Sequence, residues 1–166
     1  MKRAVFSGAM LVCFTVAALL SSATGQEKAK SKDLLKDLKC FIMKKRKVKK
    51  TKVVKYKGAK LYLCCGTCVK RMKKTPQKYE AKANHQVVYT GQFVQKACPI
   101  SGKPLGEKSA VLKVGGVAVK FASTAHKDKV AKLKADKQIE AVFGKGAFKK
   151  GQYQLVKKKK KSTKTT

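Results

Sequence analysis

The sequence predicts an α+β protein made of two small tandem units, each a β-hairpin followed by a short helix. Three observations predict this fold. The pattern of the chain recurs without gaps after a shift that places Cys40 on Cys98. In each copy a turn, Lys57-Gly58 or Gly115-Gly116, separates two β-rich segments, and glycine permits the positive φ that tight hairpin turns need. A helical stretch then begins near Thr67 in the first copy and near Thr124 in the second.

The internal repeat rests on residues of matching character more than on identity. Its aligned pairs are Cys40 and Cys98, Val53 and Val111, Val54 and Leu112, Gly58 and Gly116, Leu61 and Val119, Leu63 and Phe121, Cys68 and His126, and Met72 and Val130. The pairs fall at the same kinds of structural position, which makes a chance match improbable.

The strands and helices of each unit follow from local pattern. Residues 51–56 and 110–114 are β-rich, and the segments after the turns alternate apolar and polar residues, as strands with one buried face do. The first helix is expected to end before Thr75-Pro76, because proline disfavours helix in the residue before it. We expect extra strand pieces at residues 87–89 and 93–94.

These patterns divide the chain into six segments. They are a signal peptide (1–25), a polar leader with a short helix (26–39), the first unit (40–83), a connector (84–97), a second, degenerate unit (98–156) and a basic disordered tail (157–166).

The first segment has the layout of a secretory signal peptide. Lys2 and Arg3 precede an apolar run over residues 9–20, and small residues follow at 21–25, with cleavage expected near Ala23 or Gly25. The apolar run is shorter than the ~20 residues that a membrane-spanning helix needs. We therefore expect an exported protein, periplasmic or extracellular, with no membrane span after cleavage.

The charge of the chain is extreme. It has 42 Lys and Arg against 8 Asp and Glu, a formal charge of +34, and only three of the basic residues are arginine. Such a chain attracts polyanions, nucleic acid or acidic polysaccharide, without specific recognition, since lysine lacks the fork of arginine. A merely solvated, biased surface is an equal alternative. The densest basic run is Lys157, Lys158, Lys159, Lys160 and Lys161.

A cysteine cluster is the strongest chemical signal. Cys64, Cys65 and Cys68 lie at the expected strand-to-helix corner, and Cys40 lies just before the hairpin. A helix N-terminus favours thiolate, and thiolates suit zinc or monovalent copper. The sequence therefore predicts one thiophilic ion held by Cys40, Cys64 and Cys68. Cys65, His85, water or a second chain is the candidate fourth ligand.

Other uses of the cysteines stay open at this point. A structural disulfide, most simply between Cys40 and Cys68, would also join these segments. A thiol-redox role for the Cys65-to-Cys68 spacing lacks a surrounding βαβ pattern. In the second unit Ala122 and Ser123 replace the first two corner cysteines, so Cys98 and His126 form at most a weak second site.

The first unit resembles the YHS domain and the related TRASH domain. The resemblance covers residues 40–79: a cysteine, the hairpin with its Leu63-Cys64-Cys65-Gly66-Thr67-Cys68 corner, and the helix end Thr75-Pro76-Gln77-Lys78-Tyr79. It implies a treble-clef or zinc-ribbon-like unit that binds metal through Cys40, Cys64 and Cys68. The sequence departs from the family at Cys40-Phe41, where many members have Cys-Pro, and at Met43, where a polar residue is common; Cys98-Pro99 matches better.

The sequence predicts a binding protein and no enzyme. No Ser, His and acid set is arranged for nucleophilic catalysis, and no glycine loop lies in a strand-to-helix context that could cradle phosphate. The function favoured is an exported heavy-metal, zinc or copper protein acting as carrier, buffer or sensor. The alternative is an envelope polyanion-binding protein whose cysteines form structural disulfides; the sequence names no protein partner.

We predict that deleting residues 157–166 lowers the affinity for polyanions only in part, because most of the 42 basic residues lie elsewhere. Retention on an anionic matrix should weaken steeply with salt, since counterion release drives the binding. Salt elution of the full and shortened chains measures both effects. Elution of the full chain at the position of a neutral protein would contradict the prediction.

Overall fold

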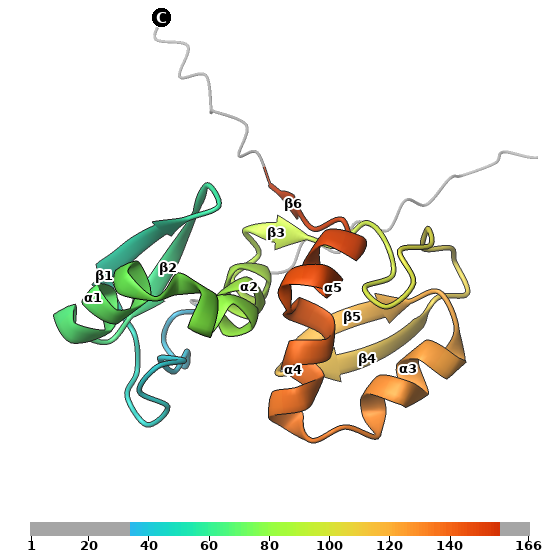
Figure 1. Ribbon diagram of the computed structural model, residues 1–166, viewed down its shortest axis with the longest axis horizontal. Helices are drawn as coiled ribbons and strands as arrows, with labels where there is room; N and C mark the ends of the chain where they lie inside the picture. Colours follow the sequence, from blue (N-terminus) through green and yellow to red (C-terminus); the bar gives the residue numbers. More distant parts are fainter. Residues whose placement is uncertain (1–33, 157–166) are drawn as a thin grey trace, which may run out of the picture. The chain divides into compact units, whose positions relative to one another are not determined.

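The computed structural model describes residues 34–156, and it is an α+β fold of short antiparallel hairpins and several helices (Figure 1). The first half runs β1 (Lys49–Tyr56), β2 (Ala59–Leu63), α1 (Gly66–Lys74), the 3-10 turn η1 (Pro76–Tyr79), α2 (Glu80–Tyr89) and β3 (Phe93–Val94). The second half runs β4 (Ala110–Val114), β5 (Val117–Phe121), α3 (Thr124–Ala131), α4 (Ala135–Phe143), α5 (Lys145–Lys150) and β6 (Gln154–Leu155). The predicted signal peptide, residues 26–33 of the predicted leader and the segment with Lys157 to Lys161 lie outside the described residues.

Both predicted hairpins are present. β1 pairs with β2 and β4 pairs with β5, each antiparallel. The turn residues have positive φ, 48° and 81° at Lys57 and Gly58 and 57° and 86° at Gly115 and Gly116. In each case a helix follows the second strand after a two-residue corner.

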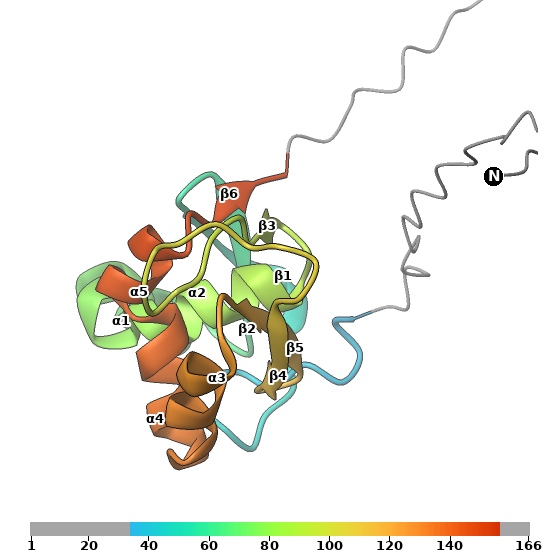
Figure 2. The same cartoon turned by 90° about the vertical axis from the view of Figure 1, so that its right-hand side faces the viewer.

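The two hairpin-and-helix segments keep the offset seen in the sequence. The shift that places Cys40 on Cys98 also places both ends of β2 on the ends of β5, and the first residue of α1 on the first residue of α3. Figure 2 shows α3 and α4 beside the second hairpin; α3 contacts both β4 and β5, and α4 contacts β4 and α3. Further helices follow in both copies: η1 and α2 come after α1, and α4 and α5 come after α3.

Two sequence predictions were wrong. Residues 34–37 form turns and bends where the leader helix was predicted. Leu34 is exposed there, so the leucines do not form a buried apolar face. A helix this short is not stable without such burial. Residues 87–89, predicted as a strand, belong to helix α2. This helix also runs across the predicted boundary between residues 83 and 84. The other predicted strand, at 93–94, is confirmed as β3, which pairs with β6.

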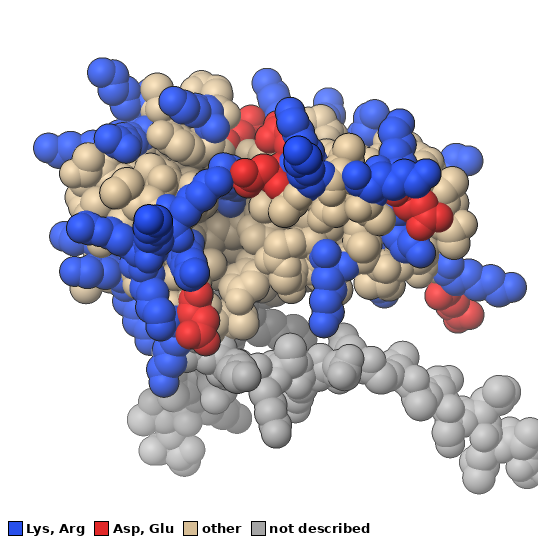
Figure 3. All heavy atoms as spheres, turned by 90° about the horizontal axis from the view of Figure 1, so that it is seen from below, with Lys and Arg blue, Asp and Glu red and all other residues tan. Residues whose placement is uncertain are grey.

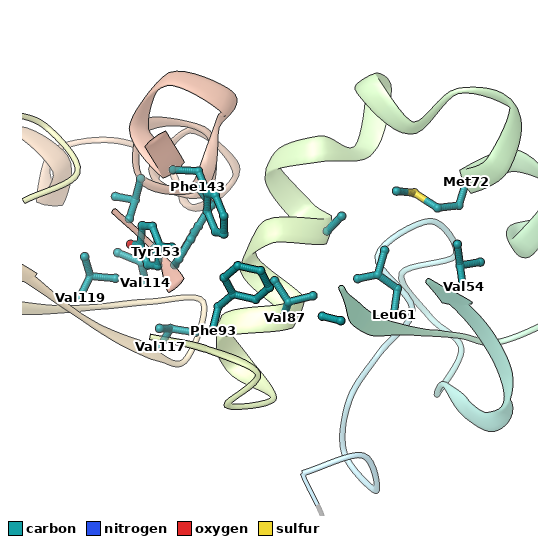
Figure 4. Close-up of a cluster of buried hydrophobic side chains, with 14 of the residues drawn as sticks. Val54, Leu61, Met72, Val87, Phe93, Val114, Val117, Val119, Phe143 and Tyr153 are labelled. Carbon is teal, nitrogen blue, oxygen red and sulfur yellow. The ribbon is translucent and has the colours of Figure 1, made fainter. Parts of the chain in front are cut away.

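Helix α2 lies between the two hairpins in the core (Figure 4). It buries Ala83 and Val87, four residues apart on one face, and it contacts β2, β5 and α4. Figure 4 shows Val54, Leu61 and Met72 grouped on one side of Val87, and Val114, Val119 and Phe143 on the other.

Asn84 of α2 is a buried polar link between the halves. Its Oδ1 accepts a hydrogen bond from the Tyr56 hydroxyl at 2.9 Å, and its Nδ2 donates to the Phe143 carbonyl at 2.8 Å. Both ends of the amide are therefore satisfied, as a buried amide requires.

Glutamine side chains from other segments hydrogen-bond to the backbone of the second strand of each hairpin, on the edge away from the first strand. The Gln86 amide accepts from the Tyr62 N–H and donates to the Tyr62 carbonyl, both at 2.9 Å. The Gln92 amide likewise accepts from the N–H of Lys60 and donates to its carbonyl. Gln95 makes the same two hydrogen bonds to Lys120, the counterpart of Tyr62 in the second hairpin. Each amide thus makes the pair of bonds that a neighbouring strand would make.

No helix in the part of the chain that the structure describes is long and apolar enough to cross a membrane.

We predict that Gln86→Leu destabilises the fold by about 1–3 kcal/mol, because the N–H and carbonyl of Tyr62 would lose their partners beside a buried side chain. Urea unfolding of the two proteins measures the change. Gln77→Leu, at an exposed position of η1, is the matched control and should stay within about 0.5 kcal/mol of wild type. Equal stability of Gln86→Leu and wild type would contradict the prediction.

Candidate metal centre

Three segments of the first unit bring cysteines to one place. Cys40 precedes the loop that leads into β1, and the backbone of that loop is closed by a hydrogen bond from the Cys40 N–H to the Arg46 carbonyl at 2.8 Å. Cys64 follows the last residue of β2, and Cys68 lies in the first turn of α1. The corner between strand and helix therefore aims two cysteines the same way, and the loop supplies the third.

The Sγ atoms of Cys40, Cys64 and Cys68 all lie within 4.8 Å of one another, and those of Cys64 and Cys68 are 3.6 Å apart. Sulfurs bound to one tetrahedral zinc at about 2.3 Å are about 3.8 Å apart. The three residues are buried, with 0%, 4% and 1% of their surface exposed. The separations and the burial therefore fit three ligands of one enclosed ion.

Cys65 lies at the margin of this cluster. It is the N-cap residue of α1 and is partly exposed. Its Sγ is 3.8 Å from that of Cys64 and 3.6 Å from that of Cys68, but it does not belong to the buried group that includes Cys40. Cys65 can therefore reach two of the three thiols without being enclosed with them.

The thiols of the cluster differ in acidity. Burial opposes ionisation of Cys40, but hydrogen bonds from backbone N–H groups, first that of Met43, leave its pKa below the usual value. Hydrogen bonds from the backbone and side chain of Cys68 lower the pKa of Cys65 to about 7. Burial raises the pKa values of Cys64 and Cys68. An ion bound to all three buried sulfurs must displace the protons of Cys64 and Cys68.

All five cysteines in the described part of the chain are free thiols. The Cys40–Cys68 disulfide, the alternative left open by the sequence, is thus not formed here. The sulfurs remain available as ligands.

His85, a candidate fourth ligand, is used elsewhere in the fold. Its Nε2 is 3.0 Å from the carbonyl oxygen of Gly115, and its ring meets that of Phe143 edge-on at 5.1 Å. Burial lowers its pKa. The structure places His85 against the turn of the second hairpin and does not bring it into the cysteine group.

The candidate second site consists of two side chains. The Cys98 Sγ and the His126 Nδ1 are 3.8 Å apart, at the positions that correspond to Cys40 and Cys68. Ser123 caps helix α3 by accepting a hydrogen bond from the His126 N–H. Within residues 34–156 no third metal-binding side chain joins this pair in one group.

Sequence reasoning missed the backbone donors of the cluster. The N–H groups of Ile42 and Met43 act on the Cys40 thiol, and any residue type other than proline supplies an N–H. The only sequence signal was the position of Cys40 ahead of a short loop.

A scan against family models, a search of curated proteins and a search of solved structures found no match to this chain. The resemblance to the YHS and TRASH domains therefore stays a prediction.

Proposed function

We propose that this is an exported, non-enzymatic protein that holds one thiophilic ion, zinc or monovalent copper, through Cys40, Cys64 and Cys68. It would serve as a carrier, buffer or sensor of that ion. The observation that carries the proposal is the convergence of three buried thiols within 4.8 Å of one another.

The donor set supports a soft metal. It consists only of sulfur, and no Asp or Glu occurs in the sequence between Asp37 and Glu80. Calcium and magnesium prefer oxygen ligands, whereas thiolates select zinc and monovalent copper. A single disulfide would use two of the three sulfurs and leave the third without a role.

The position of the cluster also supports a metal. It joins the loop before β1, the end of β2 and the start of α1, and its three cysteines belong to the buried core. A metal bound by ligands from three segments links them, and its binding free energy adds to the free energy of folding. Metal binding would thus stabilise the first unit as well as provide the function.

Export is proposed from the signal-peptide pattern of residues 1–25, and the resemblance to metal-binding YHS and TRASH domains points to the same function. Partly exposed Cys65 supports a role in which the ion is passed on, because a fully enclosed ion exchanges only when the site opens.

We predict that the reduced protein binds about one zinc or monovalent copper ion and that Cys68→Ser lowers both the stoichiometry and the melting temperature of the metal-loaded protein. At a free-ion concentration about 100 times Kd, binding stabilises the fold by about 2.7 kcal/mol. Elemental analysis and thermal melts, with and without added ion, measure the two effects. His126→Ala is the control, and it should change neither.

Full metal stoichiometry in Cys68→Ser would refute this site. So would a Cys40–Cys68 disulfide in protein isolated without reductant, detected by mass spectrometry; the cysteines would then be structural.

We also predict that Cys65→Ser keeps the metal stoichiometry but slows transfer of the ion to a competing thiol chelator. The partly exposed Cys65 sulfur lies 3.6 Å from that of Cys68 and can take over the ion as another ligand leaves. Stopped-flow transfer kinetics measure the rate. Cys98→Ser, which removes a buried thiol elsewhere, is the control; an unchanged rate in Cys65→Ser would contradict the prediction.

A further inference from the structure

The outward face of the first hairpin carries an unusual set of side chains. Val54, Leu61 and Leu63 are buried on the inner face. The outward residues are Val53 paired with Tyr62 and Lys55 paired with Lys60. Both lysines are exposed, while Val53 and Tyr62 are half-buried.

Lys55 and Lys60 are cross-strand neighbours of like charge. The N–H and carbonyl of Lys60 both bind Gln92, on the side of β2 away from β1. The pair is therefore of the non-hydrogen-bonded kind, in which the Cα atoms are only about 4.5 Å apart and the side chains are closest. Like charges in this position destabilise a sheet.

The surroundings do not relieve this repulsion. No Asp or Glu occurs between Asp37 and Glu80 in the sequence, and within residues 34–156 neither lysine of the pair has a carboxylate partner. Figure 3 shows one face of the molecule, on which basic side chains are widespread and acidic ones few. An anion bound from solution would neutralise the two lysine charges.

Tyr62 lies on the same face as Lys60, two residues along β2. Its backbone is fixed by the two hydrogen bonds to Gln86. A half-buried tyrosine on a fixed backbone, on the face that also carries Lys55 and Lys60, offers an apolar surface among basic side chains. An apolar ring face beside an acidic group is what a uronic acid residue presents to such a surface.

The second hairpin provides an internal comparison. At the corresponding positions, Lys113 is paired with Ala118 and Val111 with Lys120. The lysine pair and the tyrosine are both absent there. The second hairpin has two outward lysines as well, Lys113 and Lys120, but they are not paired across the strands. The directly opposed lysines beside a tyrosine are thus particular to the first hairpin and are not a requirement of the hairpin fold.

We propose that the outward face of β1 and β2 binds an acidic polysaccharide, with Lys55 and Lys60 contacting carboxylate or sulfate groups and Tyr62 contacting a sugar ring. Nucleic acid is the less suitable partner. Its phosphates and bases are recognised best by arginine forks and by successive aromatic side chains, and this face has two lysines and one tyrosine.

The test uses the full mature chain and measures the affinity for a polygalacturonate oligosaccharide by calorimetry at about 0.1 M salt, where distant charges are largely screened. Lys55→Ala and Lys60→Ala should each weaken binding about fivefold, equivalent to about 1 kcal/mol. Lys113→Ala, which removes the same charge at the corresponding place, should change it less than about twofold.

A thermal melt of the sugar-free proteins gives a second readout. Lys60→Ala should melt at the wild-type temperature or above it, because it removes the repulsion with Lys55 and leaves the fold intact. Equal affinity losses in Lys60→Ala and Lys113→Ala would overturn the proposal in favour of binding by net charge. Tighter binding of an oligothymidylate of equal charge, weakened by Lys60→Ala, would overturn it in favour of nucleic acid.

Discussion

A two-stranded hairpin cannot bury its own apolar face, and the rest of this structure depends on that constraint. Each hairpin has one inward row of apolar side chains, such as Leu61 and Leu63 in the first. Helix α2 lies between the hairpins and contacts both, so the halves share one core. The cysteine cluster lies where β2 ends and α1 begins, and it ties the loop before β1 to both of them.

The sequence was sufficient for features that are set locally. Glycines in the turns and alternating apolar residues identified both hairpins, and the Thr75-Pro76 step identified the end of α1. Helix α2 was missed because its conformation depends on distant partners. Val87 and Val88 have high strand propensity, but the helix that contains them is held by residues far away in the sequence, among them Tyr56 and Phe143 through Asn84.

The candidate site was accessible to sequence reasoning for a similar reason. Cys64 and Cys68 are joined by a corner whose geometry the chain fixes within five residues, and Cys40 is brought back by the hairpin itself. The role of His85 was not accessible, because its partner, the carbonyl of Gly115, belongs to the other hairpin. The difference in acidity between Cys40 and Cys64 was also out of reach, since it depends on burial and on backbone N–H groups that carry no signature in the sequence.

The glutamine amides that bind the backbone of β2 and β5 affect how the protein behaves at high concentration. A bare strand edge invites another copy to add its own strand, which is the first step toward fibrils. Here side chains that cannot propagate a ladder already fill the hydrogen-bonding positions at Lys60, Tyr62 and Lys120. Those positions of β2 and β5 are therefore closed to a neighbour's strand, even where chains gather at high density.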